Sequence, residues 1–130
     1  MTVQGTIQWG QNDVAVVDSL EAFNDLIARL QVESNRHPIM IDVIAGDGRS
    51  LTLGLGRDMT IVSLAGPEGS PPYYASVGNE NAKGDITFDY HGEMTEFPLH
   101  HAVSFLAARE AVLQFLSESG LPNAVRWEEV

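Results

Sequence analysis

Asp89, His91 and Glu93, spaced two residues apart, are the side chains of this sequence best suited to chemistry. Two carboxylates and an imidazole can hold a divalent metal or transfer a proton if the chain folds so that they meet. Such clusters depend on pKa values that burial has shifted, and the surrounding sequence does not indicate burial. We therefore expect a solvated turn here. If these residues do meet, the chain would be a small metal-dependent hydrolase, which we keep as an alternative function.

The remaining candidates for catalysis are weak. His100 and His101 are adjacent, so a strand or an α-helix would point them to different sides, and we expect no shared metal. Gly54-Leu55-Gly56 lacks the third glycine of a dinucleotide fingerprint, and the motifs of phosphate loops, serine hydrolases and zinc proteases do not occur. The chain has no cysteine, which excludes disulfides and thiolate metal sites. The sequence therefore predicts no enzyme, with no catalytic residue, no metal and no cofactor.

The charge of the chain is more informative than its motifs. Eighteen acidic residues against seven basic ones give a formal net charge of −11, beyond the magnitude of about 2–8 that solubility alone favours. Disorder is not expected, because 44% of the residues are hydrophobic. A negative surface disfavours direct binding to nucleic acid or to an anionic membrane. A basic protein is the natural partner.

The hydrophobic pattern predicts the elements that must carry these side chains. A helix over 19–30 begins at an Asp18–Glu21 capping box and presents an apolar stripe, and a second helix covers 104–119. The stripe residues are Leu20, Phe23, Ile27 and Leu30 in the first helix and Phe105, Val112, Phe115 and Leu116 in the second. Strands are predicted over 6–10, 14–17, 38–45, 50–56, 60–65, 73–77 and 124–130.

A hairpin formed by 85–90 and 93–99 should flank His91-Gly92. Its alternation places Ile86, Phe88, Tyr90 and Phe97 on one side. If the turn has two residues, Asp85, Asp89 and Glu96 lie together on the other side, where like charges favour a cationic partner. The order of elements predicts a single domain over 1–130 of the α+β class, with a mostly antiparallel sheet and two amphipathic helices packed on it.

Aromatic residues near the chain ends and after a proline pair complete the pattern. Trp9 and Trp127 are expected to pack on the core. Tyr73 and Tyr74 follow Pro71-Pro72, and alternation along a strand should bury one of them and leave the other free to act as an interface anchor. Residues 50–56 place Thr52, Gly54 and Gly56 on one face, where a helix or another strand could approach closely.

Several segments, taken in order, resemble the first-numbered immunity protein family of bacterial polymorphic toxin systems. They are the helix at 19–30, Leu53-Gly54-Leu55-Gly56, Pro71-Pro72-Tyr73-Tyr74-Ala75-Ser76-Val77-Gly78, Thr95-Glu96-Phe97-Pro98, Ala108-Arg109-Glu110-Ala111-Val112 and Ala124-Val125-Arg126-Trp127-Glu128-Glu129-Val130. The resemblance implies a non-enzymatic antidote that binds a cognate toxin, often a nucleic-acid deaminase. Such a toxin must attract phosphate, so its substrate face should be basic.

The resemblance carries over no catalytic residue, so the candidate toxin contacts come from pattern alone. We predict Asp85, Asp89 and Glu96 as charged contacts and Tyr74 as an anchor, with Glu128 and Glu129 as weaker candidates. Residues 1–10 contain neither a basic stretch nor an apolar core, so we expect no secretory signal. We therefore expect a cytoplasmic location. The third possibility is an acidic interaction module for another basic protein. Oligomeric state does not follow from the pattern.

Overall fold

The structure is a computed structural model that describes residues 3–118 and 120–130. Its strands are β1 (Gly5–Trp9), β2 (Asp13–Val17), β3 (Ile39–Ala45), β4 (Ser50–Leu55), β5 (Met59–Thr60), β6 (Val62–Ala65), β7 (Tyr74–Val77), β8 (Asp85–Tyr90), β9 (Glu93–Pro98), β10 (Val103–Ser104) and β11 (Arg126–Glu129). Its helices are α1 (Leu20–Glu33), α2 (Phe105–Ser117) and the short 3₁₀ turns η1 (Pro67–Gly69) and η2 (Leu99–His101).

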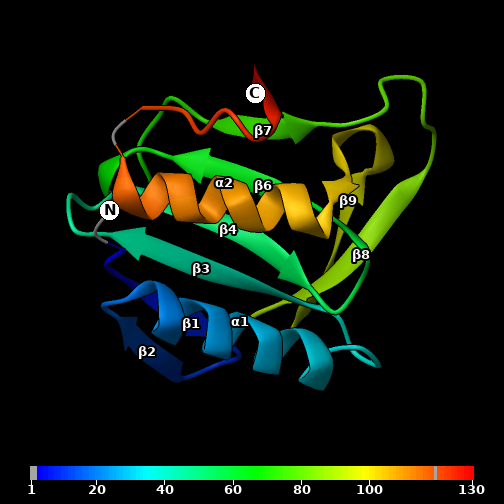
Figure 1. The fold of residues 1–130 in the computed structure, drawn as a ribbon. Coiled ribbons are helices and arrows are strands. Elements are labelled where there is room, and N and C mark those ends of the chain that lie inside the picture. Colours follow the sequence, from blue (N-terminus) through cyan, green and yellow to red (C-terminus); the bar gives the residue numbers. More distant parts are fainter. Residues whose placement is uncertain (1–2, 119) are drawn as a thin grey trace.

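The main sheet has the strand order β11-β7-β6-β4-β3-β1-β2, and each neighbouring pair in this order is antiparallel. The hairpin β8–β9 joins it through a single parallel bridge between Ile39 and Asp89. Both long helices lie across the same face of this sheet (Figure 1). The α+β class, the mostly antiparallel sheet and the packing of two helices on it are thereby confirmed.

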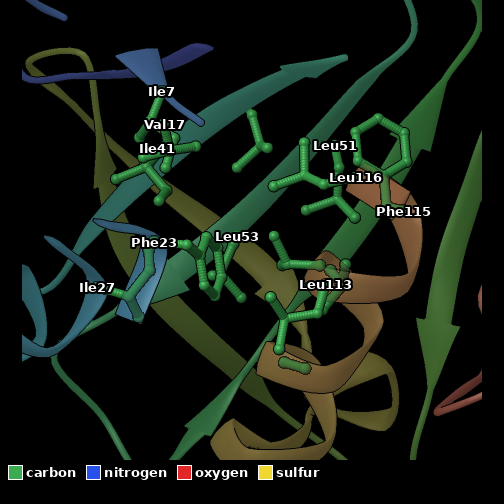
Figure 2. Close-up of a cluster of buried hydrophobic side chains, with 14 of the residues drawn as sticks. Ile7, Val17, Phe23, Ile27, Ile41, Leu51, Leu53, Leu113, Phe115 and Leu116 are labelled. Atoms are coloured by element: carbon green, nitrogen blue, oxygen red, sulfur yellow. The ribbon is translucent and has the colours of Figure 1, made fainter. Parts of the chain in front are cut away.

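The main core lies between the two helices and the sheet, where Phe23 and Ile27 of α1 and Leu113, Phe115 and Leu116 of α2 meet strand residues (Figure 2). Most of the predicted stripe residues point inward, but Leu20 is 46% exposed and Leu26 is buried in its place. Trp9 and Trp127 pack against this core as expected.

Both helices begin at a serine. The Ser19 side chain accepts a hydrogen bond from the Ala22 N–H at 3.0 Å, and the Ser104 side chain accepts one from the Ala107 N–H at 3.2 Å. The predicted cap at Asp18 is therefore wrong by one residue, because the hydroxyl of Ser19 reaches the free N–H groups of the first turn. Helix α2 ends at Ser117, and the predicted end at Ser119 lies outside the described residues.

The opposite face of the sheet carries a second, smaller core under the hairpin. It contains Met40, Ile61, Ile86, Phe88 and Ala102. A Cβ atom at Gly54 would lie 2.6 Å from two carbons of the Phe88 ring, so only glycine lets the hairpin come this close. The predicted close approach at the small residues of β4 is confirmed.

The strand predicted over 60–65 is divided at Ile61. Thr60 belongs to β5, which pairs with β10 in a separate two-stranded sheet, and Val62 begins β6 of the main sheet. The break turns Ile61 into the second core, where it is 1% exposed. The Thr60 hydroxyl donates a hydrogen bond to the Gly54 carbonyl at 2.7 Å and fixes the corner. Within the part of the chain that is described, no helix has the length and hydrophobicity to cross a membrane.

Candidate functional site

The outer face of the β8–β9 hairpin carries three of the predicted contact residues. The strand register pairs Ile86 with Phe97 and Thr87 with Glu96, which leaves a two-residue turn at His91-Gly92. Both turn residues have positive φ, 51° and 99°, as the tight turns of hairpins require. Asp85, Asp89 and Glu96 therefore share one face, as the alternation predicted, while the other face packs on the sheet.

Asp89 is the least available of these three acids. Its Oδ2 lies 2.6 Å from His37 Nε2, its Oδ1 accepts the Gly92 N–H at 2.7 Å, and only 20% of its side chain is exposed. The hydrogen bond from His37, followed by that from Gly92, lowers the pKa of Asp89. Its carboxylate fastens the hairpin to the loop after α1. Whether it also contacts a partner stays a prediction.

Asp85 and Glu96 are exposed, and within residues 3–118 and 120–130 neither forms an ion pair. Met94 lies opposite Asp89 and two residues from Glu96, on the same face of the hairpin, and 61% of it is exposed. An exposed methionine between carboxylates is an adaptable apolar contact. Sequence reasoning missed Met94, although the alternation of β9 placed it on this face.

His91 belongs to a different network from the one predicted. Its Nε2 lies 2.7 Å from Asp42 Oδ2 on β3, and its Nδ1 lies 2.5 Å from the Gly10 carbonyl oxygen. Both ring nitrogens face acceptors, an arrangement that suits the doubly protonated imidazolium. The Gly10 carbonyl, and then Asp42, accordingly raise the pKa of His91.

The predicted metal or proton-transfer cluster of Asp89, His91 and Glu93 does not form. Asp89 turns to His37, and the exposed Glu93 lies on the opposite side of the strand pair, across from Tyr90. The Tyr90 hydroxyl donates to Asp42 at 2.9 Å, and burial, followed by the Asp42 charge, raises its pKa. These side chains hold the hairpin tip on the sheet.

Arg57 holds the middle of the hairpin. Its guanidinium donates to the Thr87 carbonyl at 3.0 Å and lies over the Phe88 ring, 5.5 Å from the centroid. Together with the His37 and His91 contacts, it fixes the hairpin at its middle and at its tip. These contacts hold β8 and the turn, and β9 is held through its pairing with β8. A partner would therefore bind strands that are already ordered, which lowers the entropic cost of binding.

Tyr74 and Glu129 lie elsewhere, as cross-strand neighbours on β7 and β11. Tyr74 is half-buried against the main core and lines an open hollow of about 420 Å³ with Pro72, Phe115 and Leu121. The more exposed tyrosine is Tyr73, at 42%, and its hydroxyl donates to the Gly69 carbonyl at 2.8 Å. The predicted burial of one tyrosine is met only in part, because Tyr74 is half-buried. Tyr74 forms a wall of the hollow, and its role as an anchor stays a prediction.

Glu128 contacts the histidine pair. Its Oε1 lies 2.5 Å from His101 Nε2 and 3.6 Å from His100 Nε2, and the hydrogen bond from His101 lowers the pKa of Glu128. The prediction that adjacent histidines must diverge is wrong. They belong to the 3₁₀ turn η2, which is neither a strand nor an α-helix, and their ring centroids are 4.2 Å apart.

The predicted contact residues thus form three separate groups: the hairpin acids, the Tyr74–Glu129 pair beside the hollow, and Glu128 with the histidines. A standard protein interface covers about 800 Å² of each partner, roughly a ninth of the 7012 Å² of this surface. A single interface of this size would centre on one group. Among the described residues, the hairpin has two exposed acids without an ion pair, Asp85 and Glu96, on the same face as the exposed Met94. The group beside the hollow has one such acid, Glu129, with Leu121 exposed on the hollow wall.

Comparison with known proteins identifies the family. The sequence matches the family described as Immunity protein Imm1 over residues 11–129, which is nearly the whole chain. No curated protein matches it. The match agrees with the resemblance expected from the ordered segments between the first helix and the Trp127-Glu128-Glu129-Val130 ending. The chain belongs to the Imm1 family of immunity proteins.

Proposed function

We propose that this immunity protein neutralises its cognate toxin through the outer face of the β8–β9 hairpin. The observation that carries the proposal is the exposed Met94, which lies two residues from Glu96 and opposite Asp89, with Asp85 further along the same face. The other face of this hairpin is buried in the second core. An apolar contact surrounded by charge has the arrangement of an interface hot spot, in which a few buried side chains supply most of the affinity.

The toxin partner should present a basic surface. The net charge of −11 would speed its approach, and a basic substrate-binding face is what an enzyme acting on nucleic acid needs. We propose a nucleic-acid deaminase, the toxin class that the family resemblance implies. Occupying its substrate face would exclude phosphate by competition and would require no catalysis by the immunity protein. A cytoplasmic location follows if the toxin acts in the cytoplasm.

The test is co-expression with the toxin-domain protein encoded beside this gene. Wild-type protein should restore growth and co-purify with the toxin. Met94→Asp should reduce both, because it adds a carboxylate and removes the apolar contact at the centre of the proposed interface. Val16→Asp is the matched control, since Val16 is 71% exposed on β2 and pairs with Thr6, at the end of the sheet away from the Ile39–Asp89 bridge. Equal loss in both variants, with both folded, would contradict the assignment of the hairpin.

An acidic interaction module for an unrelated basic protein is the second candidate. The same acidic face would serve it, so the two differ only in the partner. Failure of the wild-type protein to restore growth or to co-purify with the neighbouring toxin would favour this candidate. The metal-dependent hydrolase has lost its predicted centre, because Asp89, His91 and Glu93 do not meet.

A further inference from the structure

Three side chains outside the hairpin converge on one point. His100 and His101 direct their Nε2 atoms at Oε1 of Glu128, at 3.6 Å and 2.5 Å, and the three ligand atoms all lie within 4.8 Å of one another. Two imidazole nitrogens with one carboxylate oxygen are a ligand set that Zn²⁺ uses in proteins. We propose that these three residues bind a Zn²⁺ ion, with water completing its coordination.

The spacing suits an ion of this size. Zinc binds nitrogen and oxygen at about 2.0–2.1 Å, so ligand atoms in a tetrahedral site are about 3.3 Å apart. The His100–Glu128 distance of 3.6 Å is close to this value, and the His101–Glu128 distance of 2.5 Å must open by less than about 1 Å. Rotation of the Glu128 carboxylate, whose side chain is 45% exposed, can provide that change.

The backbone already holds all three ligands in place through β7. The carbonyl of His100 accepts the Gly78 N–H at 2.9 Å, and the carbonyl of His101 accepts the Ser76 hydroxyl at 2.7 Å. Glu128 is paired with Ala75 across the β7–β11 ladder. A site whose backbone is already held in this way binds an ion at a lower ordering cost.

Gly78 allows the histidine turn to sit this close to β7. A Cβ atom at Gly78 would come 1.8 Å from the Ala102 carbonyl oxygen, so a larger residue would push η2 away. Exposure of the ligands is graded: the His101 side chain is 11% exposed and that of His100 is 37% exposed. The site is therefore largely buried at His101 and open to water at His100.

Bound zinc would fasten β11, an edge strand near the chain end, to the turn that follows the hairpin. This role is independent of the toxin, so it can be tested on the immunity protein alone. Because the ion would bind the folded state, a hundredfold excess of zinc over its dissociation constant should raise the melting temperature by at least about 5 °C.

The experiment is a calorimetric titration of the chelator-treated full chain with ZnCl₂. We expect one equivalent to bind with a dissociation constant in the micromolar range or below. His100→Gln and Glu128→Gln each remove a ligand, so each should weaken binding by about tenfold or more and reduce the thermal shift by about half or more at the same zinc concentration. Both conserve approximate size, and circular dichroism would verify folding. His37→Gln is the matched control, because His37 also contacts a carboxylate, Asp89, but lies outside the triad.

Two results would overturn the zinc site. The first is the absence of saturable binding by the wild-type protein up to millimolar zinc. The second is binding that survives in folded His100→Gln and Glu128→Gln variants with unchanged affinity, which would place the ion elsewhere. Histidine side-chain nitrogen NMR spectra give a separate readout, since zinc should shift the Nε2 signals of His100 and His101 and leave that of His37 unchanged.

Discussion

Gly54→Ala should destabilise the protein by about 1–3 kcal/mol, the usual cost of adding a methyl group to a packed interior. The added Cβ would lie 2.6 Å from Cε1 and Cζ of Phe88 and 2.6 Å from Thr60 Oγ1. Carbon atoms in contact prefer about 3.5–4.0 Å, so the ring must retreat by about 1 Å. Phe88 is completely buried, so this retreat would strain the packing of the hairpin on the sheet.

A second substitution tests this explanation directly. Phe88→Leu removes both ring carbons that the new methyl group would meet, and leaves a void instead. Alone, it should cost about 1–2 kcal/mol, below the roughly 3–5 kcal/mol of a complete Phe→Ala truncation. In the double variant the methyl group fills part of that void. The loss of unfolding free energy in the double variant should therefore be smaller than the sum of the two single losses by at least about 0.5–1 kcal/mol.

Urea denaturation followed by tryptophan fluorescence measures all four proteins, because Trp9 and Trp127 both pack against the main core. The midpoints should change while the slope m stays constant, which would show that stability changes without a change in the surface exposed on unfolding. Strictly additive costs, or a Gly54→Ala variant as stable as the wild type, would refute the argument that glycine is needed for contact between hairpin and sheet.

Three further predictions concern single side chains. Ser19→Ala removes the cap of α1 and should cost about 1 kcal/mol of unfolding free energy in the same denaturation assay; no loss would contradict the cap. Ser76→Ala should lower the unfolding free energy by about 1–3 kcal/mol, because the buried hydroxyl accepts the Val62 N–H and donates to the His101 carbonyl. A change within about ±0.5 kcal/mol, as is typical of surface positions, would refute this. The raised pKa of His91 stabilises the fold fully below its unfolded value of 6.5, and this stabilisation is lost as the pH rises through the folded value. Stability should therefore fall as the pH rises above about 6.5. His91→Asn, which suits the positive φ of the turn, should flatten that fall; an unchanged pH profile would exclude His91 as its source.

Local patterns were sufficient to predict the hairpin and both helices. The alternation of β8 and β9 around His91-Gly92 determines which side chains share a face, and the register follows it. Helical spacing likewise placed Phe23 and Phe115 in the core. These features depend on periodicity and turn chemistry within a few residues, which a single sequence contains.

The errors at the candidate site arose where distant segments meet. His37 and Asp89 are 52 residues apart, and Asp42 and His91 are 49 apart, so no local spacing indicates either contact. The convergence of His100 on Glu128 depends on a 3₁₀ turn held by β7, which periodicity does not reveal. The candidate site could therefore be placed on the hairpin, but which of its acids remain exposed could not be predicted.

The outer face of the β8–β9 hairpin is proposed to meet a basic toxin. The most direct test is the rate of association with that toxin, measured by stopped flow over a range of ionic strength. Asp85→Lys/Glu96→Lys should slow association about tenfold or more at low salt and flatten its salt dependence. Glu21→Lys/Asp25→Lys makes the same change of net charge on exposed positions of α1, and it should have a much smaller effect. Equal slowing by both folded pairs, or none by the hairpin pair, would contradict the claim.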